Sequence, residues 1–273
     1  MKIGTREFDC KNKTYVMGIL NVTPDSFSDG GKWNKIDAAL KHTQQMIQEG
    51  ADLIDVGGES TRPGYQMVTQ EEEIARTVPV IEQIKKNFDI PVSIDTYKSR
   101  VAEEAVRAGA DLVNDIWGLK YDPALADVIA HAGIPCCLMH NRRNIEEHPY
   151  QNFIEDLLSD LRESVAIAKK AGILKEQIIL DPGVGFAKTY ENNLEAIRCL
   201  DQLGGLGYPV LLGTSRKSVI GLTLDLPVTE RLEGTLVTTV AAVLGHCAFV
   251  RVHDVKENVR AIKMAQALFA HAG

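Results

Sequence analysis

Hydrophobic and polar positions follow one repeated order along the chain, in which an amphipathic stretch ends at a glycine and a short apolar run follows. A glycine just after a helix accepts the left-handed conformation that ends the helix, so each such joint predicts a change from helix to strand. Joints of this kind occur at Gly50, Gly109, Gly133, Gly172, Gly207 and Gly245.

The apolar runs themselves are short and nearly continuous, which is typical of parallel strands that are buried on both faces. Helical stretches with apolar residues three and four positions apart separate them, for example in residues 153–171. Eight strands alternating with helices predict an α/β protein built as a single (β/α)8 TIM barrel over residues 1–273. The runs cover residues 15–20, 53–56, 91–94, 112–116, 135–139, 178–180, 209–212 and 249–252.

Composition narrows the class of protein. A net charge of -7 argues against nucleic-acid binding, which usually needs a basic stripe. No apolar run approaches the roughly 20 residues that span a bilayer, and the N-terminus lacks a signal-peptide core. The five cysteines show no paired metal or redox spacing, which predicts reduced thiols in a cytoplasmic protein that does not bind membranes.

Polar residues follow every predicted strand, at the end where barrel enzymes place their active sites. A single Asp in such a position is usually a helix N-cap, and Asp95 could be one. Four neighbouring strands, however, end in Asp95, Asn114, Asp181 and Lys217, whose side chains should converge. Two carboxylates, an amide and an ammonium suit a nitrogen-rich heterocycle. The other interpretation is an internal ion-pair network that only tunes pKa values.

A second set of residues suits an anion. Arg251 and His253 alternate on the last strand and face the same side, where barrels often bind phosphate. Asn21 offers an oxygen ligand for Mg²⁺, although alone it is also an ordinary turn residue. The loops 23–32 and 57–68 are long and polar, so they are either mobile lids over the mouth or surface decoration.

The motifs at these strand ends resemble the dihydropteroate synthase family of pterin-binding enzymes. Residues 18–31 read GILNVTPDSFSDGG and residues 55–64 read DVGGESTRPG, which are similar to the family's first two signatures. Shorter motifs continue in family order at 93–96, 114–116, 181–186, 213–218 and 251–255. The resemblance runs from about residue 14 to residue 269.

The resemblance implies an enzyme that condenses 6-hydroxymethyl-7,8-dihydropterin pyrophosphate with 4-aminobenzoate, giving 7,8-dihydropteroate and pyrophosphate in folate synthesis. It implies Mg²⁺ as cofactor, small-molecule substrates and a homodimer. It assigns catalytic roles to Asp25, Arg62, Asp95 and Lys217. The pterin would be held by Asp95, Asn114, Asp181, Gly213 and Lys217 between Met139 and Phe186. Pyrophosphate and Mg²⁺ would lie at Asn21, Arg251 and His253, and 4-aminobenzoate at Thr61, Arg62, Pro63, Phe186 and Ser218.

Two rival functions remain at this stage. A methyltetrahydrofolate:corrinoid methyltransferase shares the pterin-holding residues but does not need both long loops, so their joint presence favours the synthase. A non-catalytic pterin-binding relative would be expected to have lost functional groups that this chain retains. One segment departs from the family: residues 139–143 read MHNRR where many relatives have an MHMQG-type run. The basic pair is either a solvated loop or an added anion contact.

Overall fold

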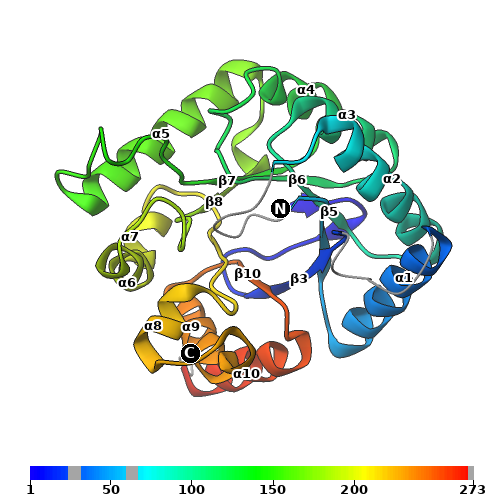
Figure 1. Ribbon diagram of the computed structural model, residues 1–273. Coiled ribbons are helices and arrows are strands. Elements are labelled where there is room, and N and C mark those ends of the chain that lie inside the picture. Colours follow the sequence, from blue (N-terminus) through cyan, green and yellow to red (C-terminus); the bar gives the residue numbers. More distant parts are fainter. Residues whose placement is uncertain (24–31, 60–66, 270–273) are drawn as a thin grey trace.

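The computed structural model describes residues 1–23, 32–59 and 67–269, and its main feature is an eight-stranded parallel sheet. Its strand order is β8-β7-β6-β5-β4-β3-β10-β9, and a parallel bridge between Leu180 and Val210 joins the two edges. The predicted (β/α)8 barrel is therefore confirmed, with the helices arranged around the strands (Figure 1). The strands are β3 (Tyr15–Asn21), β4 (Leu53–Gly57), β5 (Val92–Asp95), β6 (Leu112–Asp115), β7 (Cys136–Met139), β8 (Ile178–Asp181), β9 (Leu211–Leu212) and β10 (Phe249–Val252).

The helices bury one apolar stripe each against the outside of the barrel. In the helix over residues 153–171, which matches the predicted range, Phe153, Leu157 and Leu161 are buried at helical spacing. The helices are α1 (Lys32–Glu49), α2 (Gln70–Asn87), α3 (Ser99–Arg107), α4 (Leu125–Ala132), α5 (Phe153–Ala171), α6 (Tyr190–Arg198), α7 (Leu200–Gly204), α8 (Ser218–Leu224), α9 (Leu232–Leu244) and α10 (Val255–Phe269), with short 3-10 turns η2 (Lys175–Gln177) and η3 (Val228–Glu230).

The glycine joints behave as predicted at every position but one. Gly172, for example, ends α5 with φ 99°, in the left-handed region. Gly245 is the exception: its φ is -83°, and His246 takes the left-handed conformation instead with φ 55°. A Cβ atom at Gly245 would lie 2.7 Å from Cβ of Leu200. Glycine is needed here for close packing rather than for its backbone angle.

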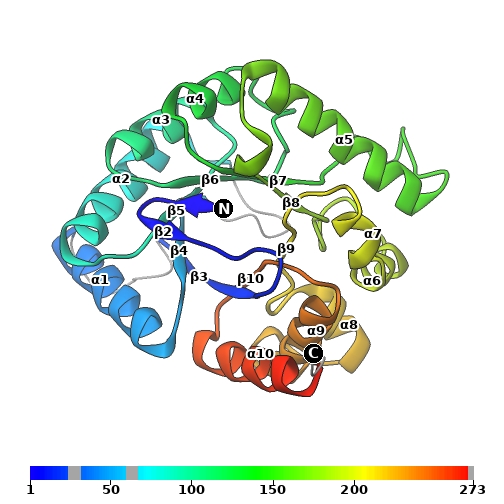
Figure 2. The same ribbon diagram turned by 180° about the vertical axis from the view of Figure 1, so that it is seen from behind.

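A small antiparallel hairpin that the sequence pattern did not predict precedes the barrel. Strands β1 (Lys2–Ile3) and β2 (Arg6–Glu7) pair with each other, and the segment lies across the centre of the barrel when it is seen from behind (Figure 2). Ile3 and Phe8 are buried against residues at the starts of the barrel strands, including Phe249. The hairpin therefore closes the N-terminal end of the barrel.

Side chains inside the barrel form two layers, because residues two apart on a strand face the same side. The lower layer packs against the hairpin and is apolar: Met17, Leu53, Leu112, Cys137, Ile179, Leu211 and Phe249. The upper layer lies two residues further along most of these strands and is mainly polar: Asp55, Asn114, Met139, Asp181, Gly213 and Arg251. We count with it Asp95, which binds Arg251, and Lys217, whose ammonium lies beside Gly213. On these strands, a move of two residues toward the C-terminal end thus leads from the packed apolar core to the candidate site.

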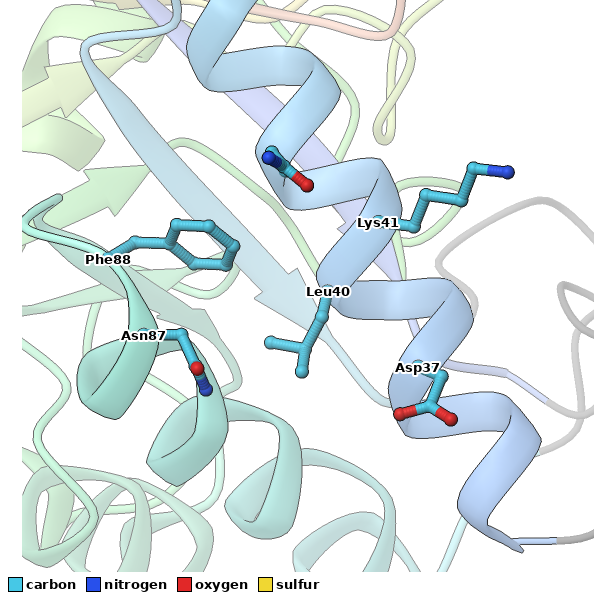
Figure 3. Close-up of a pocket in the computed structure, with 6 residues that line it drawn as sticks. Asp37, Leu40, Lys41, Asn87 and Phe88 are labelled. Atoms are coloured by element: carbon cyan, nitrogen blue, oxygen red, sulfur yellow. The ribbon is translucent and has the colours of Figure 1, made fainter.

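The outer helix layer has a groove of its own. A hollow of about 390 Å³ between α1 and α2 is lined by Leu40 and Phe88, which point toward each other, with polar neighbours (Figure 3). It contains none of the residues assigned to the barrel mouth, so we treat it as a packing groove. Among the residues that the structure describes, no helix combines the length and apolar character needed to cross a membrane.

Candidate active site

Arg251 ties several strands together at the C-terminal mouth of the barrel. Its Nε donates to Oδ2 of Asp55 at 2.6 Å, and one terminal nitrogen donates to Oδ2 of Asp95 at 2.7 Å. The side-chain amide of Asn114 donates to the same oxygen of Asp55 at 3.1 Å. Strands β10, β4, β5 and β6 therefore place one cation between two carboxylates, and Asp55 is fully buried.

The charges in this cluster are not balanced, because one guanidinium faces two carboxylates. Burial raises the pKa of Asp95 to about 7, although Arg251 opposes the shift. The other carboxylate oxygen of Asp55, Oδ1, has no hydrogen-bond partner among the described residues. A buried acceptor without a donor is unfavourable, so this cluster is costly to hold within the fold.

Asp181 and Lys217 form the second half of the upper layer. Asp181 is the last residue of β8 and accepts from the backbone N–H of Gly183 at 2.7 Å, while the Lys217 ammonium donates to the carbonyl of Val184. Burial lowers the pKa of Lys217 to about 8 and raises that of Asp181. A Cβ atom at Gly213 would lie 3.8 Å from Oδ2 of Asp181 and 3.9 Å from Nζ of Lys217, so Gly213 lies beside both charged groups.

An apolar wall lies beside these polar groups. Met139, Tyr97 and Ile116 form a small buried cluster, against which the partly exposed Phe186 and Trp117 pack. The Lys217 ammonium lies 4.8 Å from the centroid of the Phe186 ring, a cation–π contact. Apolar surfaces next to convergent donors and acceptors are what a flat, polar-edged heterocycle requires.

The rim contains the groups expected to contact an anion. Nδ1 of His253 lies 2.9 Å from the hydroxyl of Ser215, and Arg216 forms an ion pair with Asp254 that joins the same two loops. Asn21 ends β3 near Asp95: a Cβ atom at Gly57 would lie 3.5 Å from Oδ1 of Asn21 and 3.7 Å from Oδ2 of Asp95.

A metal site made by protein alone is not found in the described parts of the chain, where no three His, Cys, Asp or Glu side chains are placed to hold an ion. Mg²⁺ usually takes one or two protein oxygens and completes its shell with water and substrate phosphates. The amide oxygen of Asn21 fits such a partial set, whereas Oδ2 of Asp95 already accepts from Arg251.

The residues chosen from the sequence divide into three groups in the structure. Asp95, Asn114, Met139, Asp181, Phe186, Gly213, Lys217 and Arg251 meet at the mouth. Asn21, His253 and the exposed Ser218 lie at its rim. Asp25, Thr61, Arg62 and Pro63 lie outside the described residues.

The structure changes two interpretations that were made from the sequence. Asp95 is not a helix cap: α3 begins after Lys98 without a side-chain cap, and Asp122 accepts from the first helical N–H at 2.8 Å. Asp55 was missed, although it is the acceptor shared by Arg251 and Asn114. A carboxylate inside the apolar run 53–56 was the available signal.

The basic pair after β7 is not simply a solvated loop. Arg142 donates to Asp160 at 2.6 Å and lies 4.4 Å from the Tyr150 ring centroid. Arg143 is exposed but covers the ring of Tyr121 at 4.3 Å. Both arginines therefore contact the loops beside the site.

Comparisons with known proteins agree with this geometry. Residues 17–253 match the family model described as pterin binding enzyme. A dihydropteroate synthase from Clostridium beijerinckii is 62% identical over 269 residues, covering 98% of this chain and 99% of that protein. The structure of dihydropteroate synthase from Clostridium difficile in the presence of pteroic acid has a TM-score of 0.93 at 50% identity, covering 96% of this chain and 99% of that one. The structure of the Xanthomonas albilineans enzyme with 4-aminobenzoic acid has a TM-score of 0.90 at 40% identity, covering 96% and 98%. Because the match spans nearly the whole chain at high identity, the chain belongs to the dihydropteroate synthase family of pterin-binding enzymes, which are transferases of folate synthesis.

Proposed function

We propose that the upper layer of the barrel binds the pterin ring in the reaction of this family, the condensation of 6-hydroxymethyl-7,8-dihydropterin pyrophosphate with 4-aminobenzoate. Asp95 and Asp181 offer acceptors for the ring amino and N–H groups, and Asn114 offers both a donor and an acceptor. Lys217 donates to a ring carbonyl or nitrogen, and Met139 and Phe186 cover the ring faces. The observation that carries this proposal is the cluster at the mouth, in which Arg251 bridges Asp55 and Asp95 and Asn114 donates to Asp55.

The pyrophosphate lies toward the rim in this proposal. Cationic and hydrogen-bonding groups near Arg251 and His253 stabilise the negative charge that develops on the leaving group. Bound Mg²⁺, held by Asn21 together with substrate oxygens, would neutralise part of that charge. The proposal draws support from the amide oxygen of Asn21, which lies beside Gly57 at the mouth of the barrel, as the Asp95 carboxylate does.

The chemical step needs little acid–base catalysis. The bond between the pterin methylene and the pyrophosphate oxygen breaks, and the arylamine nitrogen forms a bond to that carbon and releases a proton. Ionised Asp95 stabilises cationic character on the methylene, which favours a dissociative path. Positional-isotope exchange in the pterin pyrophosphate should then occur without the amine; a strictly amine-dependent displacement would contradict this path.

The second substrate is assigned to the neighbouring loops. Thr61, Arg62, Pro63, Phe186 and Ser218 form the 4-aminobenzoate subsite in this proposal, with Asp25 as a further catalytic group. Support comes from the Xanthomonas albilineans relative, whose structure contains 4-aminobenzoic acid, and from Phe186 lying beside Lys217.

The helices near the C-terminus suit a homodimer contact. Leu222 of α8, Val237 of α9, and Met264 and Leu268 of α10 are 67%, 69%, 59% and 62% exposed, and their helices are neighbours in Figure 1. Exposed apolar surface of this kind marks interaction sites. Sedimentation should give a dimer that Val237→Glu converts to a monomer. The five free cysteines suit the reducing cytoplasm.

The test of the reaction is a pyrophosphate-release assay with the pterin pyrophosphate, with and without 4-aminobenzoate and Mg²⁺. We expect 7,8-dihydropteroate and one pyrophosphate per product only when all components are present. Pterin binding without any aminobenzoate-dependent product would favour the non-catalytic interpretation. Product formed without added metal in the presence of a chelator would remove Mg²⁺ from the proposal.

A further inference from the structure

A chain of side chains runs from α5 to the turn after β8, behind the apolar wall of the site. Oδ2 of Asp160 lies 2.9 Å from Nε2 of His140, and Nδ1 of His140 lies 2.9 Å from Nζ of Lys188. Lys188 in turn donates to the carbonyl of Phe186 at 3.0 Å. The side chain of His140, at the centre of this chain, is completely buried, and that of Asp160 is 19% exposed.

The proton positions in this chain follow from its contacts. Burial lowers the pKa of His140 to about 4, so its ring is neutral near pH 7 and has one N–H. Burial also lowers the pKa of Lys188 to about 7. In its ammonium form Lys188 can only donate, so Nδ1 of His140 accepts, and Nε2–H donates to the Asp160 carboxylate. Neutral His140 thus connects a cation to an anion and allows only one ring tautomer.

The turn that receives this chain is held at several points. The N–H of Phe186 donates to the carbonyl of Gly183 at 3.1 Å, and the hydroxyl of Tyr150 donates to the carbonyl of Ala187 at 3.0 Å. Ala187 has φ 43°, a left-handed conformation that a non-glycine residue adopts only where its surroundings hold it. Arg142 packs on Tyr150 and also binds Asp160, so the departure after β7 belongs to the same assembly.

We propose that Lys188, fixed by His140 and Asp160, is a positioning residue that sets the Phe186 ring against Lys217 and so shapes the pterin subsite. This inference rests on the proposed function of Phe186 and Lys217. Lys188 acts through the backbone of Phe186, and no contact of Lys188 with substrate is required. Loss of its ammonium would release the Phe186 carbonyl and leave His140 without its donor.

The test compares Lys188→Met with Lys169→Met, the same change at an exposed lysine of α5. For Lys188→Met we expect the Kd for pteroic acid, measured by calorimetry, and the KM for the pterin pyrophosphate to rise about tenfold, as loss of a charged hydrogen bond implies. We expect kcat to change by less than about threefold, because the reacting groups remain in place. Lys169→Met should match the unaltered enzyme. Wild-type Kd and KM in Lys188→Met would overturn the proposal, as would a fall in kcat with KM unchanged.

A second variant keeps the proposal testable if Lys188→Met does not fold. Asp160→Asn retains the size of the side chain and removes its charge, and it should raise the Kd for pteroic acid about threefold, since a partly exposed ion pair contributes up to about 1 kcal/mol. An unchanged Kd would overturn the proposal. If the proposed function itself is wrong, the unaltered enzyme will form no dihydropteroate; if only this inference is wrong, that activity will persist and the variants will bind like wild type.

Discussion

The two ends of the barrel are built from the same strands but differ in chemistry. At the N-terminal end, Phe8 packs on Tyr15 and Phe249 with ring centroids 4.8 Å and 5.6 Å apart. At the C-terminal end, two residues beyond Phe249, Arg251 binds Asp55 and Asp95. Both layers are buried, but only the lower layer is stabilised by its burial.

The difference shows that the lower layer contributes mainly to stability and the upper layer mainly to function. Apolar burial stabilises the lower layer at about 25 cal/mol per Å² of surface removed from water. In the upper layer, burial raises the pKa of Asp95 and Asp181 and lowers that of Lys217, so each shift opposes the charged form. Such a layer is less favourable when empty than when filled by complementary donors and acceptors.

Truncation at the lower layer should have the largest effect and should act on stability. Phe8→Ala removes an aromatic side chain that is 4% exposed, so the free energy of unfolding should fall by about 3–5 kcal/mol. The parameter kcat/KM, measured where the variant is still folded, should stay within twofold of wild type. Denaturant unfolding and steady-state kinetics check both; a large loss of kcat/KM with stability intact would break the division between the layers.

The corresponding change in the upper layer should act on function. Lys217→Met should lower kcat/KM for the pterin pyrophosphate about 100-fold, because a charged hydrogen bond to a ligand contributes about 1.5–3 kcal/mol. Its melting temperature should be unchanged or higher, since burial disfavours the Lys217 charge. Kinetics and thermal unfolding, with Lys169→Met as control, test this; a destabilised variant with normal kcat/KM would contradict it.

The charge of Asp95 should appear in the pH profile. Burial raises its pKa from 3.8 to about 7, and the proposed role needs the carboxylate, so kcat/KM should fall about tenfold per pH unit below that value. Because the folded state holds this proton more tightly than the unfolded chain does, the same group lowers stability as the pH rises between these two values. In Asp95→Asn both dependences should be absent. A profile that is flat from pH 5 to 8 in the unaltered enzyme would refute the assignment.

The smallest expected effect concerns His253, and it should distinguish the pyrophosphate subsite at the rim from the subsite for the pterin ring. His253→Ala should raise KM for the pterin pyrophosphate about tenfold through the loss of one hydrogen bond to an anion. The Kd for pteroic acid, which has no pyrophosphate, should not change. Calorimetry beside kinetics measures both, and equal weakening of the two ligands would remove the distinction between rim and ring.

The sequence predicted the barrel well because its physical signals are local. Parallel strands buried on both faces give short apolar runs, and glycine marks the ends of the preceding helices. The hairpin at residues 2–7 was not predicted because strands of two residues are too short to show an alternation of apolar and polar positions. The sequence pattern also did not show that His246, and not Gly245, takes the left-handed conformation. Gly245 is needed for packing against Leu200, and no local pattern reports such a contact.

The sequence predicted many of the residues of the site but not the hydrogen bonds and ion pairs between them. Strand ends and family motifs identified Asp95, Asn114, Asp181 and Lys217, but the partners of Arg251 arise only when the barrel closes. Asp55 lies 196 positions from Arg251 in the chain. Likewise, the segment after β7 looked like an exposed basic loop until Asp160 and Tyr150 were placed beside Arg142.

The affinity of Asp181→Asn for pteroic acid, measured together with its melting temperature, tests the central claim most directly. The asparagine oxygen can still accept from the N–H of Gly183, so the substitution removes charge and little else. If the buried cluster is a pterin site, the Kd should rise at least about thirtyfold, as loss of a charged hydrogen bond implies, while the melting temperature stays the same or increases. A lower melting temperature with unchanged affinity would instead show that the cluster is an internal ion-pair network.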